Sequence, residues 1–151
     1  MRTLIIGCGN ADRGDDAAGV LVARKLRAEG FPTLERCGEA TSLIESWLGI
    51  ENVILVDAVI TGSEPGTILS WDARTQRLSR AAFRCSTHTF SVADAIELAR
   101  ILDRLPPRVF IYGIEAAQFA AGTRPSPAVL EAVERLAEQI AHEVSGYARV
   151  V

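Results

Sequence analysis

The chain has 151 residues, of which 48% are hydrophobic and 23% charged, and its formal net charge at pH 7 is −3. A chain of this length suits a single domain, residues 1–151, which buries about two-thirds of the surface that is exposed in the unfolded form. The chain is mildly acidic and its arginines are scattered, which argues against a nucleic-acid partner. It has no apolar run of roughly 20 residues that would span a membrane and no signal peptide, so we expect a cytoplasmic protein without a membrane segment.

Strand and helix signals alternate along the chain. Continuous apolar runs predict buried strands, and apolar residues at helical spacing predict amphipathic helices. The predicted elements are, in chain order, a strand at 3–6, a helix at 15–29, a weak strand at 33–37, a short helix at 40–48, a strand at 53–56, a short antiparallel or edge strand at 67–71, a helix at 91–103, a strand at 108–114 and a last helix from residue 127. Residues 72–87 have no clear period and are predicted to form a long loop.

Helix boundaries are marked by local signals. Gly30 is a stop, and Ser91 with Asp94 has the form of a capping box. Ser126 can cap the last helix, and Pro127 can take its first position. The last helix has a regular apolar stripe: Val129, Val133, Leu136, Ile140 and Val144. The alternation of strands and helices predicts an α/β fold with three layers, in which a twisted, mostly parallel sheet has helices on both faces.

Four polar residues fall at strand-to-helix connections. Asp16 follows the first strand, Asp57 ends a central strand, His88 precedes a helix and Glu115 ends a late strand. Such connections share the carboxyl edge of a doubly wound sheet, where ligands bind. Two carboxylates and one imidazole suit a divalent transition ion, such as nickel or zinc, with positions left open for water or substrate. Taken singly, Asp57 and His88 can equally serve as hydrogen-bond partners of loops.

The neighbouring residues have simpler interpretations. Asp15 is expected to cap the helix that follows and to complement its dipole. Asn10 is expected to shape the glycine turn, and its alternative role is to orient a peptide carbonyl. The three cysteines are odd in number and widely spaced, which indicates neither a zinc knuckle nor a disulfide framework. Cys37 is expected to be a small buried residue, whereas Cys8 and Cys85 remain candidate ligands or redox-sensitive thiols.

Several motifs together resemble one family, the hydrogenase maturation proteases. Each motif is short, but they cover nearly the whole chain in the order and at the spacing typical of that family. They are Gly7-x-Gly9-Asn10, Asp15-Asp16 with Gly19-Val20, Val56-Asp57-Ala58, His88 ahead of Ser91-x-x-Asp94, Gly113-Ile114-Glu115, and Ser126-Pro127.

The resemblance implies a five- or six-stranded sheet of the phosphorylase/hydrolase-like kind. It also implies an endopeptidase that removes the C-terminal extension of a nickel–iron hydrogenase large-subunit precursor after nickel insertion. The family's three metal-site positions correspond to Asp16, Asp57 and His88, which would serve in both metal binding and catalysis, by an aspartic-type or a metal-assisted mechanism. Nickel would be supplied by the precursor, and other divalent ions such as zinc or cadmium can occupy such a site. The partner would be that precursor, and the chain a monomer or a weak homo-oligomer.

Two departures from the family pattern affect these expectations. Some members have Glu where Asp16 stands, and the shorter side chain would bring a bound ion closer to the helix start. In the family, a proline often follows the acid of the motif that is Gly113-Ile114-Glu115 in this chain, whereas this chain has Ala116 at that position. The functional role of Glu115 is therefore left open.

Three other interpretations can be compared with this one. A dinucleotide-binding fingerprint would need a third glycine where the chain has Asp12, and acids in the turn would repel pyrophosphate. The glycine turn also resembles that of peptidyl-tRNA hydrolases, but the histidine that follows in that family and a basic face for tRNA are missing. A nickel-sensing chaperone that binds the same precursor without cutting it would use the same three ligands.

Overall fold

The structure is a computed structural model that describes residues 2–37, 39–83 and 91–148. These residues form one five-stranded sheet in the order β2-β1-β3-β5-β4. The strands are β1 (Thr3–Cys8), β2 (Thr33–Arg36), β3 (Asn52–Val59), β4 (Ile68–Asp72) and β5 (Arg108–Glu115). The first four strands in the spatial order are parallel, and β4 is antiparallel to β5 at the sheet edge. The predicted mostly parallel sheet and the antiparallel edge strand are confirmed.

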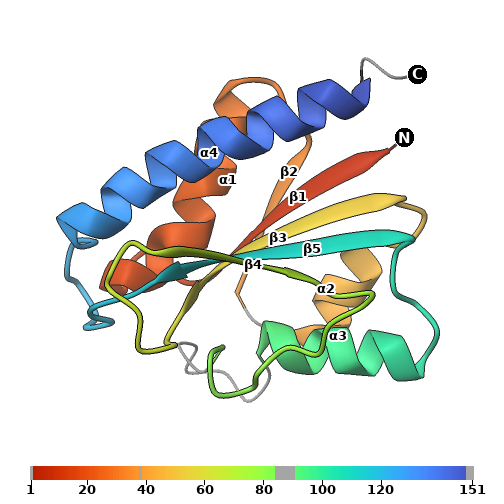
Figure 1. Cartoon of the computed structure of the whole chain (residues 1–151), viewed down its shortest axis with the longest axis horizontal. Helices are drawn as coiled ribbons and strands as arrows, with labels where there is room; N and C mark the ends of the chain where they lie inside the picture. The colour runs from red at the N-terminus through yellow and green to blue at the C-terminus, as the bar shows by residue number, and fades with distance from the viewer. Residues whose placement is uncertain (1, 38, 84–90, 149–151) are drawn as a thin grey trace.

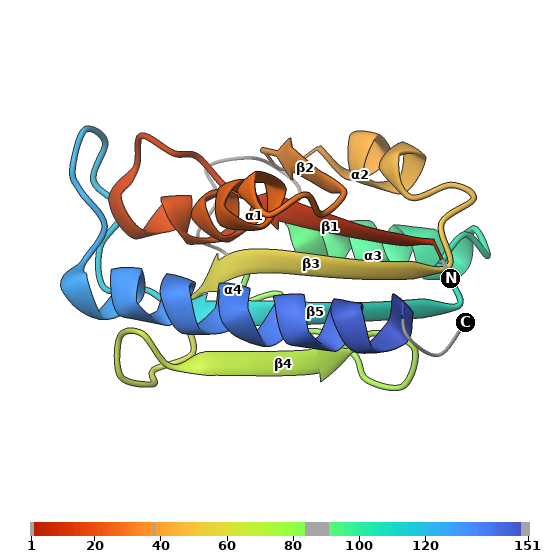
Figure 2. The same cartoon turned by 90° about the horizontal axis from the view of Figure 1, so that it is seen from above.

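Helices cover both faces of the sheet (Figures 1 and 2). The helices are a one-turn 3-10 helix η1 (Gly14–Ala17), followed by α1 (Ala18–Ala28), α2 (Ala40–Ser46), α3 (Val92–Ile101) and α4 (Pro127–Ala148). Apolar residues of α1 and α4 pack on one face of the sheet, and those of α2 and α3 on the other. The three-layer α/β architecture follows from these two cores.

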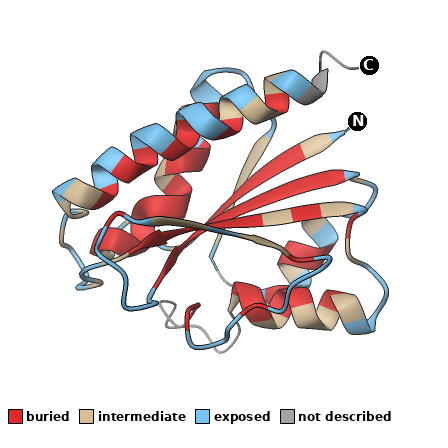
Figure 3. Cartoon of the chain, in the orientation of Figure 1, coloured by how far each residue is buried: buried red, intermediate tan, exposed pale blue. Residues whose placement is uncertain are grey.

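Burial explains why the elements form where they do. The central strand β3 is buried along its whole length, as expected for a parallel strand covered on both faces (Figure 3). The predicted stripe of α4 is buried, and α3 begins with the predicted capping box of Ser91 and Asp94. Gly30 has φ of 91°, which supports its role as a helix stop. Among the described residues, no helix has the length and apolarity needed to cross a membrane.

Two predicted boundaries differ from the structure in a way that matters for the site. The first helix starts as the 3-10 turn η1 at Gly14 and not as an α-helix at residue 15. The strand predicted at 53–56 continues to Val59, because Val59 pairs with Glu115 of the equally extended β5. Asp57 therefore lies inside β3, opposite Gly113, and not at its end. Of the loop predicted at 72–87, residues 73–83 contain neither helix nor strand, and 84–87 lie outside the described residues.

Close backbone contacts bring η1 to the carboxyl edge of the sheet. A Cβ atom on Gly7 of β1 would lie 2.2 Å from the carbonyl oxygen of Gly19 in α1, and one on Gly19 would lie 2.2 Å from that of Val56 in β3. Only glycine fits at both positions, so α1 can rest directly on β1 and β3. The turn that precedes α1 is thereby placed above the ends of the two strands.

Candidate functional site

Asp16 lies in η1, directly after the glycine turn that ends β1. Gly9 has φ of 128°, and a Cβ atom there would lie 2.0 Å from the carbonyl oxygen of Asp16, so the turn requires glycine. The Asp16 side chain is buried, and its Oδ2 accepts a hydrogen bond of 3.1 Å from the N–H of Asn10. The glycine turn thus places a carboxylate at the edge of the sheet, as the sequence predicts.

Asp57 is the second acid at this edge. Side chains alternate along β3, and Leu55 and Val59 pack in the core formed with α2 and α3, so Asp57 faces the same layer. Asp57 is 7% exposed, and its Oδ1 accepts a hydrogen bond of 2.9 Å from the N–H of Ala58. Burial, and secondly the charge of Asp16, raise the pKa of Asp57 well above its ordinary value, while the Ala58 bond opposes this shift. The two acids are therefore electrostatically coupled.

Cys8, the last residue of β1, lies close to this acid pair. Burial raises the pKa of its thiol well above the ordinary value, and the charges of Asp57 and Asp16 add to the shift, whereas Arg36 opposes it. A thiol in this environment stays protonated, which disfavours the thiolate that a nucleophile needs. Cys37 is exposed, which corrects the expectation that it is buried: it follows the last residue of edge strand β2. Cys85 lies outside the described residues.

His88 also lies outside the described residues, so its placement relative to Asp16 and Asp57 stays a prediction. Within residues 2–37, 39–83 and 91–148, no group of three or more His, Cys, Asp or Glu is arranged to hold a metal ion. The two carboxylates of the predicted triad are both buried, and the charge of Asp16 acts on Asp57. The third ligand is predicted from the sequence alone.

Asp15 differs from the expectation that it caps the helix it precedes. It lies inside η1, and neither η1 nor α1 has a side-chain cap. Its fully buried carboxylate instead binds the connection between β5 and α4, where it accepts hydrogen bonds from the N–H groups of Ala117, Gln118 and Ser126 and from the Ser126 hydroxyl. Asp15 is therefore a tertiary anchor, and Ser126 donates its hydroxyl hydrogen to it.

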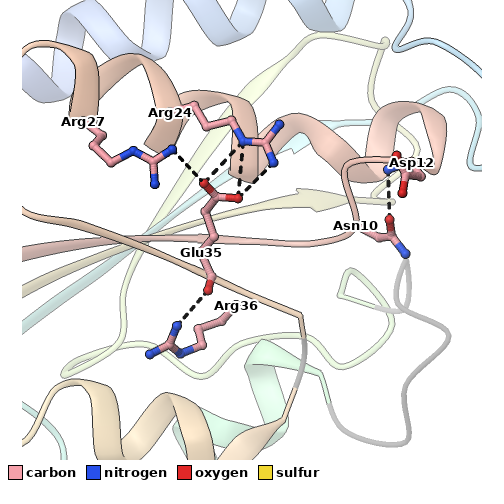
Figure 4. A network of polar contacts seen from close by, with 6 residues as sticks. All are labelled: Asn10, Asp12, Arg24, Arg27, Glu35 and Arg36. Carbon is pink, nitrogen blue, oxygen red and sulfur yellow. Dashed lines mark hydrogen bonds and ion pairs between the residues drawn. The ribbon is translucent and has the colours of Figure 1, made fainter.

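Glu115 and Asn10 also have defined structural partners. Both carboxylate oxygens of the buried Glu115 accept the Thr61 N–H at 3.0 Å, and Oε1 also accepts the Thr61 hydroxyl. Glu115 thus fastens the bend after β3 to the end of β5. The side-chain oxygen of Asn10 accepts the N–H of Asp12 at 2.9 Å, which confirms its role in the turn (Figure 4).

Sequence reasoning missed Arg36, a cation close to the site. It pairs with Cys8 in the register of β1 and β2. Its Nε donates to the Ser46 hydroxyl at 3.1 Å. Its Nη1 donates to the Glu35 carbonyl at 2.9 Å, as Figure 4 shows. Arg36 falls near the end of the strand predicted at 33–37, and this position alone indicates the carboxyl edge of the sheet.

Comparison with known proteins adds independent findings. The protein-family model described as "Hydrogenase maturation protease" matches residues 37–143 of the chain. The chain is 30% identical to the nickel–iron hydrogenase maturation protease HycI from Thermococcus kodakarensis, with 93% of this chain and 90% of that chain covered and a TM-score of 0.73. The hydrogenase maturating endopeptidase HybD from E. coli shares the fold, with 19% identity, coverage of 97% and 94%, and a TM-score of 0.74. Protein FrxA from Pyrococcus furiosus is 27% identical over 130 residues, 84% of this chain and 93% of that protein.

Proposed function

The chain belongs to the hydrogenase maturation protease family, and from that premise we propose that it is an endopeptidase that removes the C-terminal extension of a nickel-loaded nickel–iron hydrogenase large-subunit precursor. The observation that carries the proposal is the pair of buried carboxylates, Asp16 and Asp57, at the carboxyl edge of the sheet. This edge is where α/β folds of this kind bind their ligands.

The donor chemistry of the pair fits a divalent cation. Burial of a carboxylate disfavours its ionised form, and the charge of Asp16 adds to this effect at Asp57. A divalent cation close to both would offset the burial and the mutual repulsion. Asp16, Asp57 and His88 would hold the nickel that the precursor carries, so the ion acts as part of the substrate and marks a precursor that is ready to be cut.

The same pair supplies the acid–base chemistry of peptide hydrolysis. In the proposed reaction, a water oxygen bonds to the scissile carbonyl carbon while a carboxylate oxygen of the pair accepts a proton from that water. The C–N bond then breaks, and the proton passes to the leaving nitrogen. Each carboxylate has two oxygens, so one can contact a cation while the other accepts the proton.

The test uses nickel-loaded and nickel-free precursor, incubated with the protein and analysed by mass spectrometry. We expect a shortened large subunit and a released C-terminal peptide from the nickel-loaded precursor alone. Treating this protein with a strong chelator beforehand should leave cleavage unchanged, and zinc should not replace nickel in the precursor.

Two other outcomes would each contradict part of the proposal. If chelation abolishes cleavage and zinc restores it with either precursor, the protein has a catalytic metal of its own. If nickel-loaded precursor binds but is not cut, the protein is a chaperone and not a peptidase.

A further inference from the structure

We propose that Asp15 is a positioning residue: it anchors η1 to residues 116–126 and thereby holds Asp16 at the site. This inference rests on the function proposed above, because it assigns to Asp15 a part in the same reaction. Residues 116–126 connect β5 to α4 and are called the β5–α4 connection below.

The carboxylate of Asp15 is saturated by donors from the β5–α4 connection. Oδ2 accepts the N–H of Ala117 at 2.7 Å, the N–H of Gln118 at 3.0 Å and the hydroxyl of Ser126 at 2.8 Å. Oδ1 accepts the N–H of Ser126 at 2.6 Å. Four donors from a segment 102 or more positions away in the chain converge on one fully buried side chain. Charge-assisted bonds of this kind are about twice as strong as neutral ones.

Backbone bonds extend this junction on both sides of Asp15. The N–H of Asp15 donates to the carbonyl of Gln118 at 2.9 Å, and the N–H of Gly14 donates to that of Thr123 at 3.1 Å. The N–H of Gly122 in turn donates to the carbonyl of Asp12 at 2.7 Å. A Cβ atom on Gly14 would lie 2.7 Å from Oγ1 of Thr123, so the two segments are in close contact. The turn and the β5–α4 connection therefore form one packed unit.

The turn needs such an anchor because it is short. η1 is a single 3-10 turn without a side-chain cap, and an isolated turn of this kind is not stable in water. Successive residues of a 3-10 helix point about 120° apart, so Asp15 can face the β5–α4 connection while Asp16 faces Asp57. Asp15 therefore fixes the turn, and Asp16 presents its carboxylate to the site.

An aspartate side chain is required at this position by its hydrogen bonding. Asparagine has almost the same shape but offers one acceptor oxygen and an NH₂ group. If its oxygen takes the place of Oδ2, its NH₂ group faces the N–H of Ser126; if it takes the place of Oδ1, the NH₂ group faces the N–H groups of Ala117 and Gln118. Either orientation sets donors against donors, so Asp15→Asn loosens the junction without creating a cavity.

The N–H of Asn10 gives a direct reading of where Asp16 lies, because it donates to Asp16 Oδ2. We would record hydrogen exchange and the amide proton shift of Asn10 by NMR in four proteins: the parent, Asp15→Asn, Asp16→Ala as the reference for a lost bond, and Ile140→Val. Ile140 is buried in α4, away from the junction, so its variant controls for a loss of stability alone. We expect exchange at Asn10 to be at least about tenfold faster in Asp15→Asn, with a shift toward that of Asp16→Ala, and no change in Ile140→Val.

Cleavage kinetics then separate positioning from stability. At a temperature where every variant is folded, Asp15→Asn should lower kcat by about 100-fold with little change in KM, because a misplacement of about 1 Å has effects of that size. Ile140→Val should keep the parent kcat. A purely structural role for Asp15 would lower the unfolding midpoint and leave both kcat and the Asn10 amide unchanged, and this result would overturn the proposal.

A second variant covers the case in which Asp15→Asn does not fold. Ser126→Ala removes one of the four donors and should give the same changes at smaller size, about two- to fivefold in exchange at Asn10. An Asn10 amide that is unchanged in Ser126→Ala would then count against positioning. If the parent protein does not cut the precursor at all, the proposed function is wrong, whereas the Asn10 measurement still decides whether Asp15 holds Asp16.

Discussion

Asp15 and Asp57 are both buried at the carboxyl edge of the sheet, but their surroundings differ. The Asp15 carboxylate accepts four hydrogen bonds from the β5–α4 connection, whereas within the described residues the Asp57 carboxylate accepts one, from the N–H of the next residue. Burying a carboxylate is unfavourable unless bonds or charges offset it. At Asp57 the imbalance appears as a raised pKa, caused first by burial and then by Asp16. The hydrogen-bond partners, more than the burial, distinguish a structural carboxylate from one available for chemistry.

The largest expected effect is that of Asp57→Asn on activity. Removing one acid of the pair should lower the cleavage rate by about 1000-fold, which is within the range for loss of an acid–base group. The same change should raise the thermal unfolding midpoint by a few °C, because it removes a buried charge that has few partners. Asp12→Asn, at an exposed acid of the same edge, is the control and should change neither quantity. If Asp57→Asn still cleaves the precursor and has a lower unfolding midpoint, Asp57 is a structural residue, as Asp15 is.

Asp15→Ala should act in the opposite way on stability. The substitution leaves three backbone N–H groups and one hydroxyl without their acceptor, and we expect a loss of about 3 kcal/mol in the free energy of unfolding. Urea denaturation of Asp15→Ala and Asp57→Asn, measured side by side, compares their free energies of unfolding directly. If both variants lose stability equally, hydrogen-bond partners do not distinguish the two acids.

Glu115 extends the comparison to a third buried acid, whose partners resemble those of Asp15. A double-mutant cycle with Glu115→Gln and Thr61→Val should give a coupling energy of about 1–2 kcal/mol, because Thr61→Val removes the hydroxyl that donates to the Glu115 carboxylate and keeps the backbone N–H. Unfolding by urea measures each corner of the cycle. A coupling near zero would show that the bond from the Thr61 hydroxyl adds nothing to stability.

The smallest expected effect is a pH dependence that comes from Asp57. Its folded-state pKa is raised, so between the ordinary aspartate value of about 3.9 and the folded value the folded protein binds more protons than the unfolded chain. The contribution of Asp57 to stability is therefore complete below the ordinary value and decreases as pH rises through the folded value. Asp57→Asn should lack this component, so its stability relative to the parent should grow with pH across this window. A difference that stays constant with pH would show that Asp57 titrates normally.

Local signals in the sequence were sufficient for most of the fold. The apolar runs at 3–6 and 53–56, the capping box at Ser91 and the stripe of α4 each depend on a few neighbouring residues, and each is confirmed. The alternation of these elements then predicts a three-layer α/β sheet, because right-handed crossovers leave few other arrangements. The placement of Asp16 at the carboxyl edge follows in the same way, while the third proposed ligand, His88, rests on the sequence alone.

Only the tertiary structure decided the roles of the other acids at this edge. Asp57 lies inside β3 because its strand pairs with β5 as far as Val59, and this length depends on a partner strand 56 residues later in the chain. Asp15 anchors the β5–α4 connection and Glu115 fastens the bend at Thr61, through hydrogen bonds between residues 102 and 54 positions apart. Periodicity and capping describe the chain over one or two helical turns. Contacts of this range are fixed by strand order and by the packing of loops, and these depend on the whole fold.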